Sequence, residues 1–238
     1  DADSEREEGK FYVWTREAVQ ALLSADEFAA AALHWGLDAP PNFEATHWHL
    51  RVTRSLAAVA QQLGHPHGEE ACAALLESAR SRLFSVRERR VRPGRDEKIL
   101  GSWNALMIGG MARAGAVFGR TQWIESARRA LDFIRATLWR GGRLLATYKD
   151  GRAHLNAYLD DHAFLLAAAI ELVQAEFRSD TLEFALHLAD ALIEHFEDRQ
   201  KGGFFFTSHD HERLIHRSKI GHDNATPSGN GVAAFALQ

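Results

Sequence analysis

Two neighbouring stretches decide the fold: ALMIGGMARAGAVF at residues 105–118 and TQWIESARRALDFIRATLW at residues 121–139. The first has Arg113 as its only charge, so as a helix it is apolar on almost every side, which is typical of a helix buried all round. The second, as a helix, places Leu131 and the other apolar residues at helical spacing on one face and charged residues on the opposite face. This pattern predicts a helix with one face in contact with solvent.

The same order recurs along the chain. Residues 159–177 are again apolar all round and residues 180–197 are striped, while residues 70–89 predict a further striped helix and residues 227–238 open another buried one. Helices joined by short turns pack antiparallel, so the buried helices all run in one direction. A ring of inner helices sheathed by outer ones satisfies both patterns. The sequence therefore predicts an all-α fold, an incomplete α/α toroid.

Short β-hairpins are expected between an outer helix and the next inner one. Gly141 to Thr147 leads into the two-residue turn Asp150-Gly151. Gly202 to Thr207 predicts a strand that returns over residues 213–217, and residues 9–15 have the same character. All these hairpins would lie at the pole where the inner helices begin, so we look for a site there.

Composition excludes several classes of protein. The 238 residues are 46% hydrophobic and 25% charged, with a net charge of -4 and no basic stripe, so a nucleic-acid partner is not expected. A single cysteine, Cys72, leaves no internal disulfide and favours a cytoplasmic protein. The apolar runs are too short for a membrane helix. No phosphate loop or dinucleotide motif occurs, so no cofactor is predicted, and residues 1–238 are expected to form a fragment of one barrel domain.

Carboxylates cluster at the starts of the inner helices. They have two interpretations, because Asp is a favoured helix cap and because two carboxylates at the anomeric centre of a sugar can share acid-base work. Asp160 and Asp161 are adjacent and cannot both cap with the same geometry, so one is expected to point into the ring. The candidate catalytic residues are Asp160, Asp161, Asp96 and Asp223.

Aromatic, amide and basic residues accompany these carboxylates. The rings can be platforms for sugar faces or plugs that hold the hairpins, and the cations can bind an anionic ligand or pair with nearby carboxylates. His162 and other histidines near the pole could act as acid or base near neutral pH, so an epimerase that works by proton transfer stays a possible function. The candidate substrate-binding residues are Trp103, Asn104, Tyr158, His162, Phe205, Arg217, Lys219, Ser228 and Asn230.

Histidines also occur as pairs spaced by one residue, a pattern that raises the question of a metal. Zinc needs about four ligands, and none of the pairs has a third ligand at a recognisable offset, so no metal site is predicted. The pairs are His47 and His49, His65 and His67, and His209 and His211.

Several motifs together resemble a known family, in which a thioredoxin-like domain precedes an N-acylglucosamine 2-epimerase-like helical barrel and whose animal members are spermatogenesis-associated proteins. The motifs are Asp1-Ala2-Asp3-Ser4, Glu8 to Thr15, Asp96-Glu97-Lys98, Ser102-Trp103-Asn104, Tyr158 to Asp161, Gly202 to Thr207 and Pro227 to Asn230. The resemblance implies a six-hairpin barrel of the glycosidase and epimerase superfamily, here without its thioredoxin-like domain and its C-terminal barrel helices.

Two functions follow as hypotheses. The first is a carbohydrate-binding barrel, with glycosidase-like or epimerase-like conversion of a sugar or sugar derivative left open. The alternative is a non-catalytic barrel that docks a protein or peptide for the thioredoxin-like domain. An incomplete ring would also leave an apolar seam, so we expect it to be covered by the missing parts of a longer chain or by a second copy.

Overall fold

The computed structural model describes residues 2–64 and 68–238, so the histidine pair predicted at residues 65 and 67 lies outside the described residues. The chain divides into two compact units, one that ends at Asp96 and one that runs from Glu97 to Gln238. Each is taken by itself below, and the assignment of residues 1–238 to one barrel domain stays a prediction.

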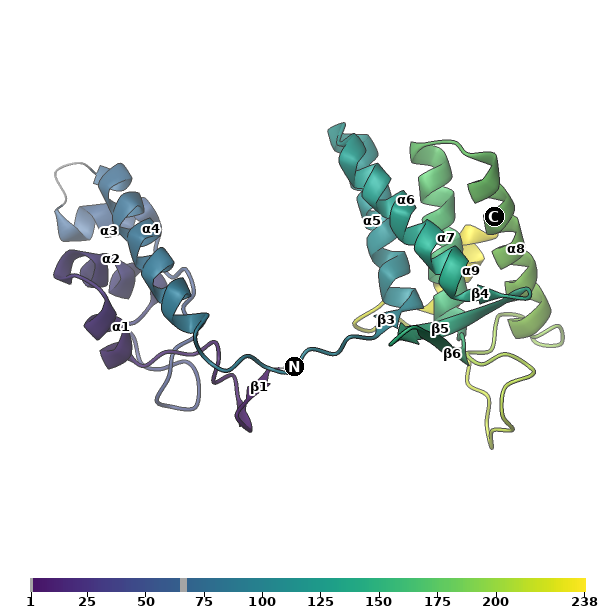
Figure 1. Cartoon of the computed structure of the whole chain (residues 1–238), viewed down its shortest axis with the longest axis horizontal. Coiled ribbons are helices and arrows are strands. Elements are labelled where there is room, and N and C mark those ends of the chain that lie inside the picture. Colours follow the sequence, from purple (N-terminus) through teal and green to yellow (C-terminus); the bar gives the residue numbers. More distant parts are fainter. Residues whose placement is uncertain (1, 65–67) are drawn as a thin grey trace. The chain divides into compact units, whose positions relative to one another are not determined.

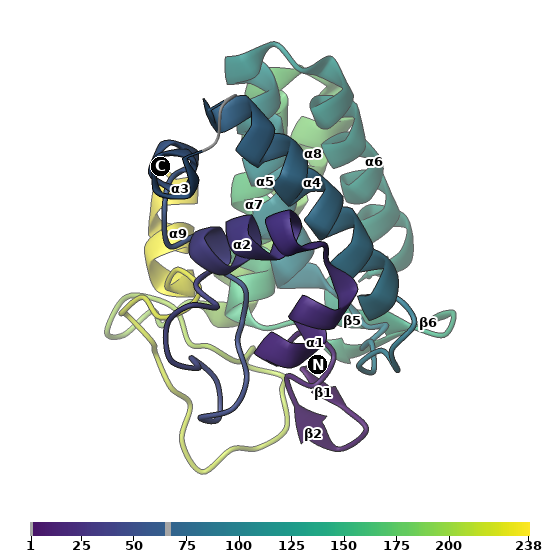
Figure 2. The same cartoon turned by 90° about the vertical axis from the view of Figure 1, so that its left-hand side faces the viewer.

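The first unit is a small helical assembly opened by a two-stranded hairpin (Figure 2). Its elements are β1 (Asp3–Ser4), β2 (Glu7–Glu8), α1 (Arg16–Leu22), α2 (Ala25–Trp35), α3 (Leu56–Leu63) and α4 (Gly68–Arg87). The caps at Thr15, Ser24 and Ser55 explain where three of these helices begin, because each side chain accepts a backbone N–H of the first turn. Striped helix α4 is confirmed, and it packs Leu76 and Leu83 into two apolar clusters.

The second unit contains the alternation of helices that the sequence predicts (Figure 1). Its elements are β3 (Ile99–Leu100), α5 (Gly101–Phe118), α6 (Thr121–Thr137), β4 (Trp139–Arg140), β5 (Arg143–Lys149), β6 (Arg152–Asn156), α7 (Leu159–Ala175), α8 (Ser179–Phe196) and α9 (Gly229–Ala236). Helix α7 packs against α5, α8 and α9, while α6 packs mainly on α5. The predicted fold class, an α/α toroid with short β-hairpins at one pole, is confirmed.

The inner helices α5 and α7 differ in how far their side chains are buried. In α7 every residue is buried or half-buried except Gln174, as predicted for a helix surrounded by others. Helix α5 differs from the prediction, because Met107, Val117 and Phe118 are 63%, 73% and 68% exposed. Helices α6 and α7 pack against α5, and within this unit no third helix covers its remaining face.

The strands of the second unit lie at the end where α5 and α7 begin (Figure 1). β5 pairs antiparallel with β3, β4 and β6, and β3 leads directly into α5. The turn at Asp150-Gly151 is confirmed, and both residues have positive φ (51° and 78°), as a tight hairpin turn requires.

Two expected hairpins are wrong. Residues 202–217 form no strand, only a single bridge between Glu197 and Phe204, because the backbone of this segment bonds to the Asn230 side chain and to isolated loop groups instead of a partner strand. Residues 9–15 likewise form only the bridge from Trp14 to Trp48, and the true hairpin there is β1 with β2. Among the helices of the described residues, none combines the length and the apolar character needed to cross a bilayer.

Candidate functional site

Asp161 joins the beginnings of two inner helices. It is the third residue of α7, and its Oδ2 accepts the backbone N–H of Tyr158 at 2.9 Å while its Oδ1 accepts the N–H of Ser102 in α5 at 2.8 Å. Only 4% of Asp161 is exposed. Burial raises the pKa of this carboxyl, although the two N–H groups act to lower it. Both oxygens of Asp161 are therefore committed to holding α5 and α7 together.

Asp160 contacts the beginning of α9, the other helix that packs against this end of α7. The backbone N–H of Gly229, the first residue of α9, hydrogen-bonds to its carboxylate. Asp160 is half-buried, and burial raises its pKa, with the Gly229 N–H acting in the opposite direction. The adjacent pair thus diverges, with Asp161 toward α5 and Asp160 toward α9, and the two carboxylates face the positive ends of these helices.

Two glycines make these approaches possible. A Cβ at Gly229 would lie 2.1 Å from Oδ1 of Asp160, and a Cβ at Gly101 would lie 3.2 Å from Oδ1 of Asp161. The first distance leaves no room for a side chain, and the second is a tight contact. Glycine at the first position of α5 and of α9 is therefore part of how the inner helices are joined at this pole.

The start of α9 is organised by its own polar residues. Ser228 caps the helix by accepting the N–H of Gly231 and donates to the carbonyl of Ile220 at 2.9 Å. Asp223 is exposed, and its Oδ1 accepts the N–H of Ser228 at 2.9 Å. The capping interpretation thus accounts for the Ser228–Gly231 bond, while the bond to Ile220 ties the start of α9 to the preceding loop.

Asn230 holds the loop that follows α8. Its Oδ1 accepts the N–H of Phe204 at 2.7 Å, and its Nδ2 donates to the carbonyl of the same residue at 2.9 Å. The side-chain amide imitates a strand partner. This explains why the aromatic segment at 204–206 is extended without forming a hairpin.

The aromatic rings of this segment have partners within the protein. Phe206 stacks on Tyr158 with ring centroids 5.0 Å apart and planes at 12°. Phe205 lies beneath two cations, with Cζ of Arg217 at 4.1 Å and Nζ of Lys219 at 4.8 Å from its centroid. The structure thus brings three predicted binding residues, Phe205, Arg217 and Lys219, into one cluster.

Both cations are also tied down by oxygen acceptors. Lys219 Nζ forms an ion pair with Asp198 and donates to the carbonyl of Gly202 at 2.8 Å, while Arg217 donates to the carbonyl of Thr207. The ion pair of Lys219 agrees with the interpretation of a cation that pairs with a nearby carboxylate, while Arg217 is held by a backbone carbonyl.

The remaining predicted residues are more dispersed. Trp103 is 66% exposed at the start of α5, and Nδ2 of Asn104 donates to the carbonyl of Leu100, so Asn104 holds its own helix end. Asp96 is the last residue of the other unit and has an exposed side chain.

His162 is fully buried and faces away from solvent. Its Nδ1 lies 3.2 Å from the carbonyl oxygen of Tyr158, its ring packs 4.9 Å from Phe196, and its Nε2 has no partner among the described residues. Burial lowers its pKa to about 4, with Arg143 and His195 adding to the effect against the Tyr158 carbonyl. A neutral histidine enclosed in this way is part of the core.

An ion pair between Arg143 on β5 and Asp210 in the loop after α8 was not predicted from the sequence. Arg143 donates to Asp210 through Nη1 at 2.5 Å and through Nη2 at 3.0 Å. The residues are 67 positions apart, and an isolated Arg followed much later by an isolated Asp has no spacing signal. In the part of the chain that the structure describes, no group of three His, Cys, Asp or Glu side chains is arranged to hold a metal ion.

Comparisons with known proteins agree with this architecture. Over its whole length the chain is similar to spermatogenesis-associated protein 20 of Homo sapiens, with 33% identity over 272 residues, and to that of Rattus norvegicus, with 30% over 270 residues. It spans 34% of each, about a third of the length of these relatives. No family model matches the chain.

Among solved structures, the chain is similar to a sugar epimerase from a ruminal bacterium, with a TM-score of 0.51 and 14% identity over 76% of this chain and 50% of the epimerase. At that identity the likeness concerns the fold alone. The resemblance drawn from the motifs is confirmed by the alignments, and the chain is a relative of spermatogenesis-associated protein 20 that matches about a third of it and has the α/α-toroid fold.

Proposed function

We propose that this chain forms part of a carbohydrate-binding barrel whose ligand is held at the pole where α5, α7 and α9 begin. The fold is shared with a sugar epimerase, and in this chain Asp160 and Asp161 join the beginnings of α5, α7 and α9 at one end of the unit. The observation that carries the proposal is Asp160, a half-buried carboxylate with a raised pKa at the meeting point of α7 and α9.

The geometry favours Asp160 over Asp161 as the group that contacts a ligand. Asp161 is buried and has both oxygens bonded to backbone N–H groups, so it positions the helices. Asp160 has one described N–H partner and partial access to solvent. A carboxyl with a raised pKa in such a place is suited to donate a hydrogen bond or a proton to a sugar hydroxyl or ring oxygen.

A paired-carboxylate mechanism has less support than single-acid proton transfer. Asp223 is exposed, and its carboxylate is bonded to the N–H of Ser228. We therefore propose that the barrel binds a sugar. We propose further that Asp160 converts the bound sugar by proton transfer.

The test is a screen of neutral sugars, uronic acids and sugar phosphates for thermal stabilisation of the protein. A ligand at about 100 times its Kd stabilises the folded state by roughly 2.7 kcal/mol, which is measurable as a shift in Tm. The stabilisation should be lost in Asp160→Asn and kept in Asp190→Asn, a matched change at an exposed position on α8. If no sugar stabilises the wild type, or Asp160→Asn responds like the control, the proposal fails.

A second candidate, a non-catalytic docking barrel, is favoured by the aromatic segment. Because Phe206 stacks on Tyr158 and Phe205 is covered by two cations, these rings fill the pole rather than stand open. Co-purification of a thioredoxin-like domain supplied as a separate polypeptide, lost on Phe205→Ala but not on Asp160→Asn, would support this candidate over carbohydrate binding.

A further inference from the structure

The first unit contains a cavity of about 520 Å³ that none of the pole residues enters. Aromatic side chains and two arginines dominate its walls, and its volume lies in the range of roughly 300 to 1,000 Å³ that is usual for small-molecule sites. Its principal lining residues are Tyr12, Trp14, Trp35, Arg80, Phe84 and Arg87.

The aromatic part of the wall offers ring surface to a ligand. Trp14 is buried and forms the inner part, whereas Tyr12 and Phe84 are 43% and 51% exposed although they line a concave surface. Large exposed rings around a hollow are suited to stack against a flat apolar face.

The two arginines differ in how far their charge is compensated. Arg80 is bound by Glu77 through two hydrogen bonds of 2.9 Å and 2.6 Å. The nearest carboxylate oxygen that pairs with Arg87 belongs to Glu88, at 3.6 Å from Nη2, which is too long for a hydrogen bond, and Glu88 is also paired with Arg92.

The position of Arg87 adds to this difference. Its guanidinium lies 5.2 Å from the centroid of Phe84, and its buried Nε has no hydrogen-bond partner among the residues that the structure describes. Arg87 is therefore a cation with unused donors beside an aromatic surface.

The wall that carries Trp14 is held in place before any ligand arrives. Nη1 of Arg90 donates to the carbonyls of Phe11 and Val13 at 3.0 Å and 2.8 Å, and its guanidinium lies 4.0 Å over the Trp14 ring. Trp14 and Trp48 also exchange backbone hydrogen bonds of 3.0 Å and 2.8 Å.

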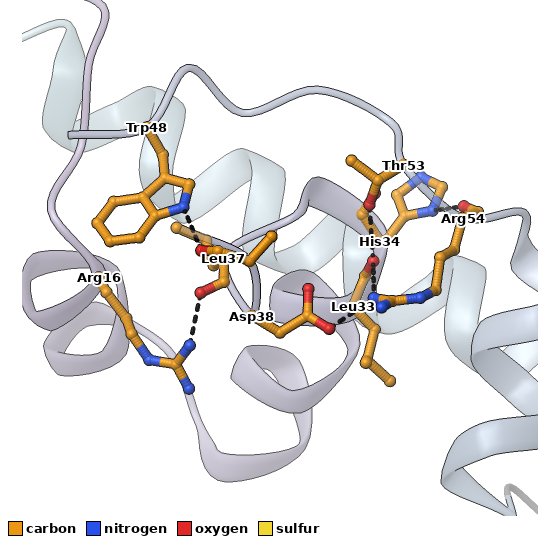
Figure 3. Close-up of polar contacts among 9 residues, drawn as sticks. Arg16, Leu33, His34, Leu37, Asp38, Trp48, Thr53 and Arg54 are labelled. Carbon is orange, nitrogen blue, oxygen red and sulfur yellow. Dashed lines mark hydrogen bonds and ion pairs between the residues drawn. The ribbon is translucent and has the colours of Figure 1, made fainter. Parts of the chain in front are cut away.

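The loop between α2 and α3 contributes His49 and Leu50 to the lining. Side chains hold this loop in place: Arg16 donates to the carbonyl of Leu37, and Arg54 pairs with Asp38 at 2.7 Å (Figure 3). The Trp48 indole donates to the carbonyl of Ala39 at 3.1 Å. A cavity built from fixed walls is a preformed site, which lowers the entropic cost of binding.

We propose that this cavity binds a small ring compound that has one flat apolar face and one anionic group, with Arg87 holding the anionic group and Phe84 and Tyr12 contacting the ring. A carboxylate and a phosphate share this chemistry, as do a sugar acid and an aromatic acid. The inference concerns the first unit alone and does not rest on the function proposed for the pole.

The test is calorimetric titration of the protein with four probes: glucuronate, glucose 6-phosphate, benzoate and uncharged glucose. At least one anionic probe should bind and glucose should not. Arg87→Gln should weaken that binding at least about tenfold, as expected for loss of a charge-assisted hydrogen bond. Arg80→Gln should weaken it less, because Glu77 already compensates the charge of Arg80. Phe84→Leu, a change at a half-exposed ring, should weaken it by roughly two- to tenfold.

Each contrary result overturns a part of the reasoning. Absence of binding by all three anions at roughly millimolar concentration removes the site, and equal binding of glucose removes the role of charge. Equal losses in Arg87→Gln and Arg80→Gln would refute the assignment to Arg87. The melting curves of the variants show whether each is folded, and Phe84→Leu tests the aromatic wall without removing a charge.

Discussion

Replacing Asp161 with Asn tests whether this carboxylate joins two helices. In the native protein its two oxygens accept the N–H groups of Ser102 and Tyr158 at 2.8 Å and 2.9 Å, at a position that is 4% exposed. An Asn side chain has one carbonyl oxygen, so it can satisfy one of these donors and must turn its own NH₂ group toward the other. One buried backbone N–H is then left without an acceptor.

The magnitude follows from two opposing effects. Loss of a hydrogen bond to a charged group costs about 1.5–3 kcal/mol. Burial of the ionised carboxylate is itself unfavourable, as the raised pKa of Asp161 indicates, and a neutral amide avoids that cost. We expect a net loss of about 1–2 kcal/mol in the free energy of unfolding, which corresponds to a fall in Tm of roughly 2–8 °C for a chain of this size.

The assay is urea and thermal unfolding followed by circular dichroism at neutral pH, with Asp160→Asn as the matched control. Asp160 has one described N–H partner and is only half-buried, so its substitution should cost less. Unfolding curves of Asp161→Asn that superimpose on those of the wild type would refute the reasoning, as would a larger loss in Asp160→Asn.

Three further predictions concern helix contacts and pH. Gly229→Ala should destabilise the protein by about 1–3 kcal/mol because its Cβ would meet Asp160 at 2.1 Å, whereas Gly110→Ala, at an exposed and open position of α5, should stabilise it by roughly 0.5–1 kcal/mol in the same denaturation assay. Burial lowers the pKa of His162 to about 4, so on acidification this histidine is protonated at a higher pH in the unfolded chain than in the folded protein. The free energy of unfolding should therefore fall by roughly 3 kcal/mol between about pH 6.5 and pH 4. His162→Gln should flatten this part of the pH profile of Tm, and the exposed His216→Gln should not; a profile unchanged by His162→Gln would contradict the assignment.

The order of the helices could be predicted because it depends on local patterns. The single charge of residues 105–118 and the stripe of Leu131 and Ile134 in α6 reflect which side chains must leave water, and Leu131 and Ile134 are 2% and 1% exposed. The Asp150-Gly151 turn is equally local, because both residues must adopt positive φ. Such features need no knowledge of distant segments.

Tertiary contacts decided the roles of the polar residues. The sequence could place Asp160 and Asp161 at a helix start, but their divergence toward α9 and α5 depends on two distant glycines. Gly229 lies 69 positions from Asp160 and Gly101 lies 60 positions from Asp161, and each allows a carboxylate to approach. The 202–207 segment has the pattern of a strand, yet Phe204 bonds to the Asn230 side chain, and the N–H groups of Phe205 and Phe206 bond to the carbonyls of Phe196 and Ser218.

What the sequence determined by itself is the sorting of apolar and charged side chains along each helix, because that sorting follows from contact with water and from the helical repeat. What only the tertiary structure decided is which backbone donor each carboxylate meets and which face of α5 remains exposed. These depend on segments brought together by folding, and a hydrogen bond across about 60 residues of chain leaves no period in the sequence.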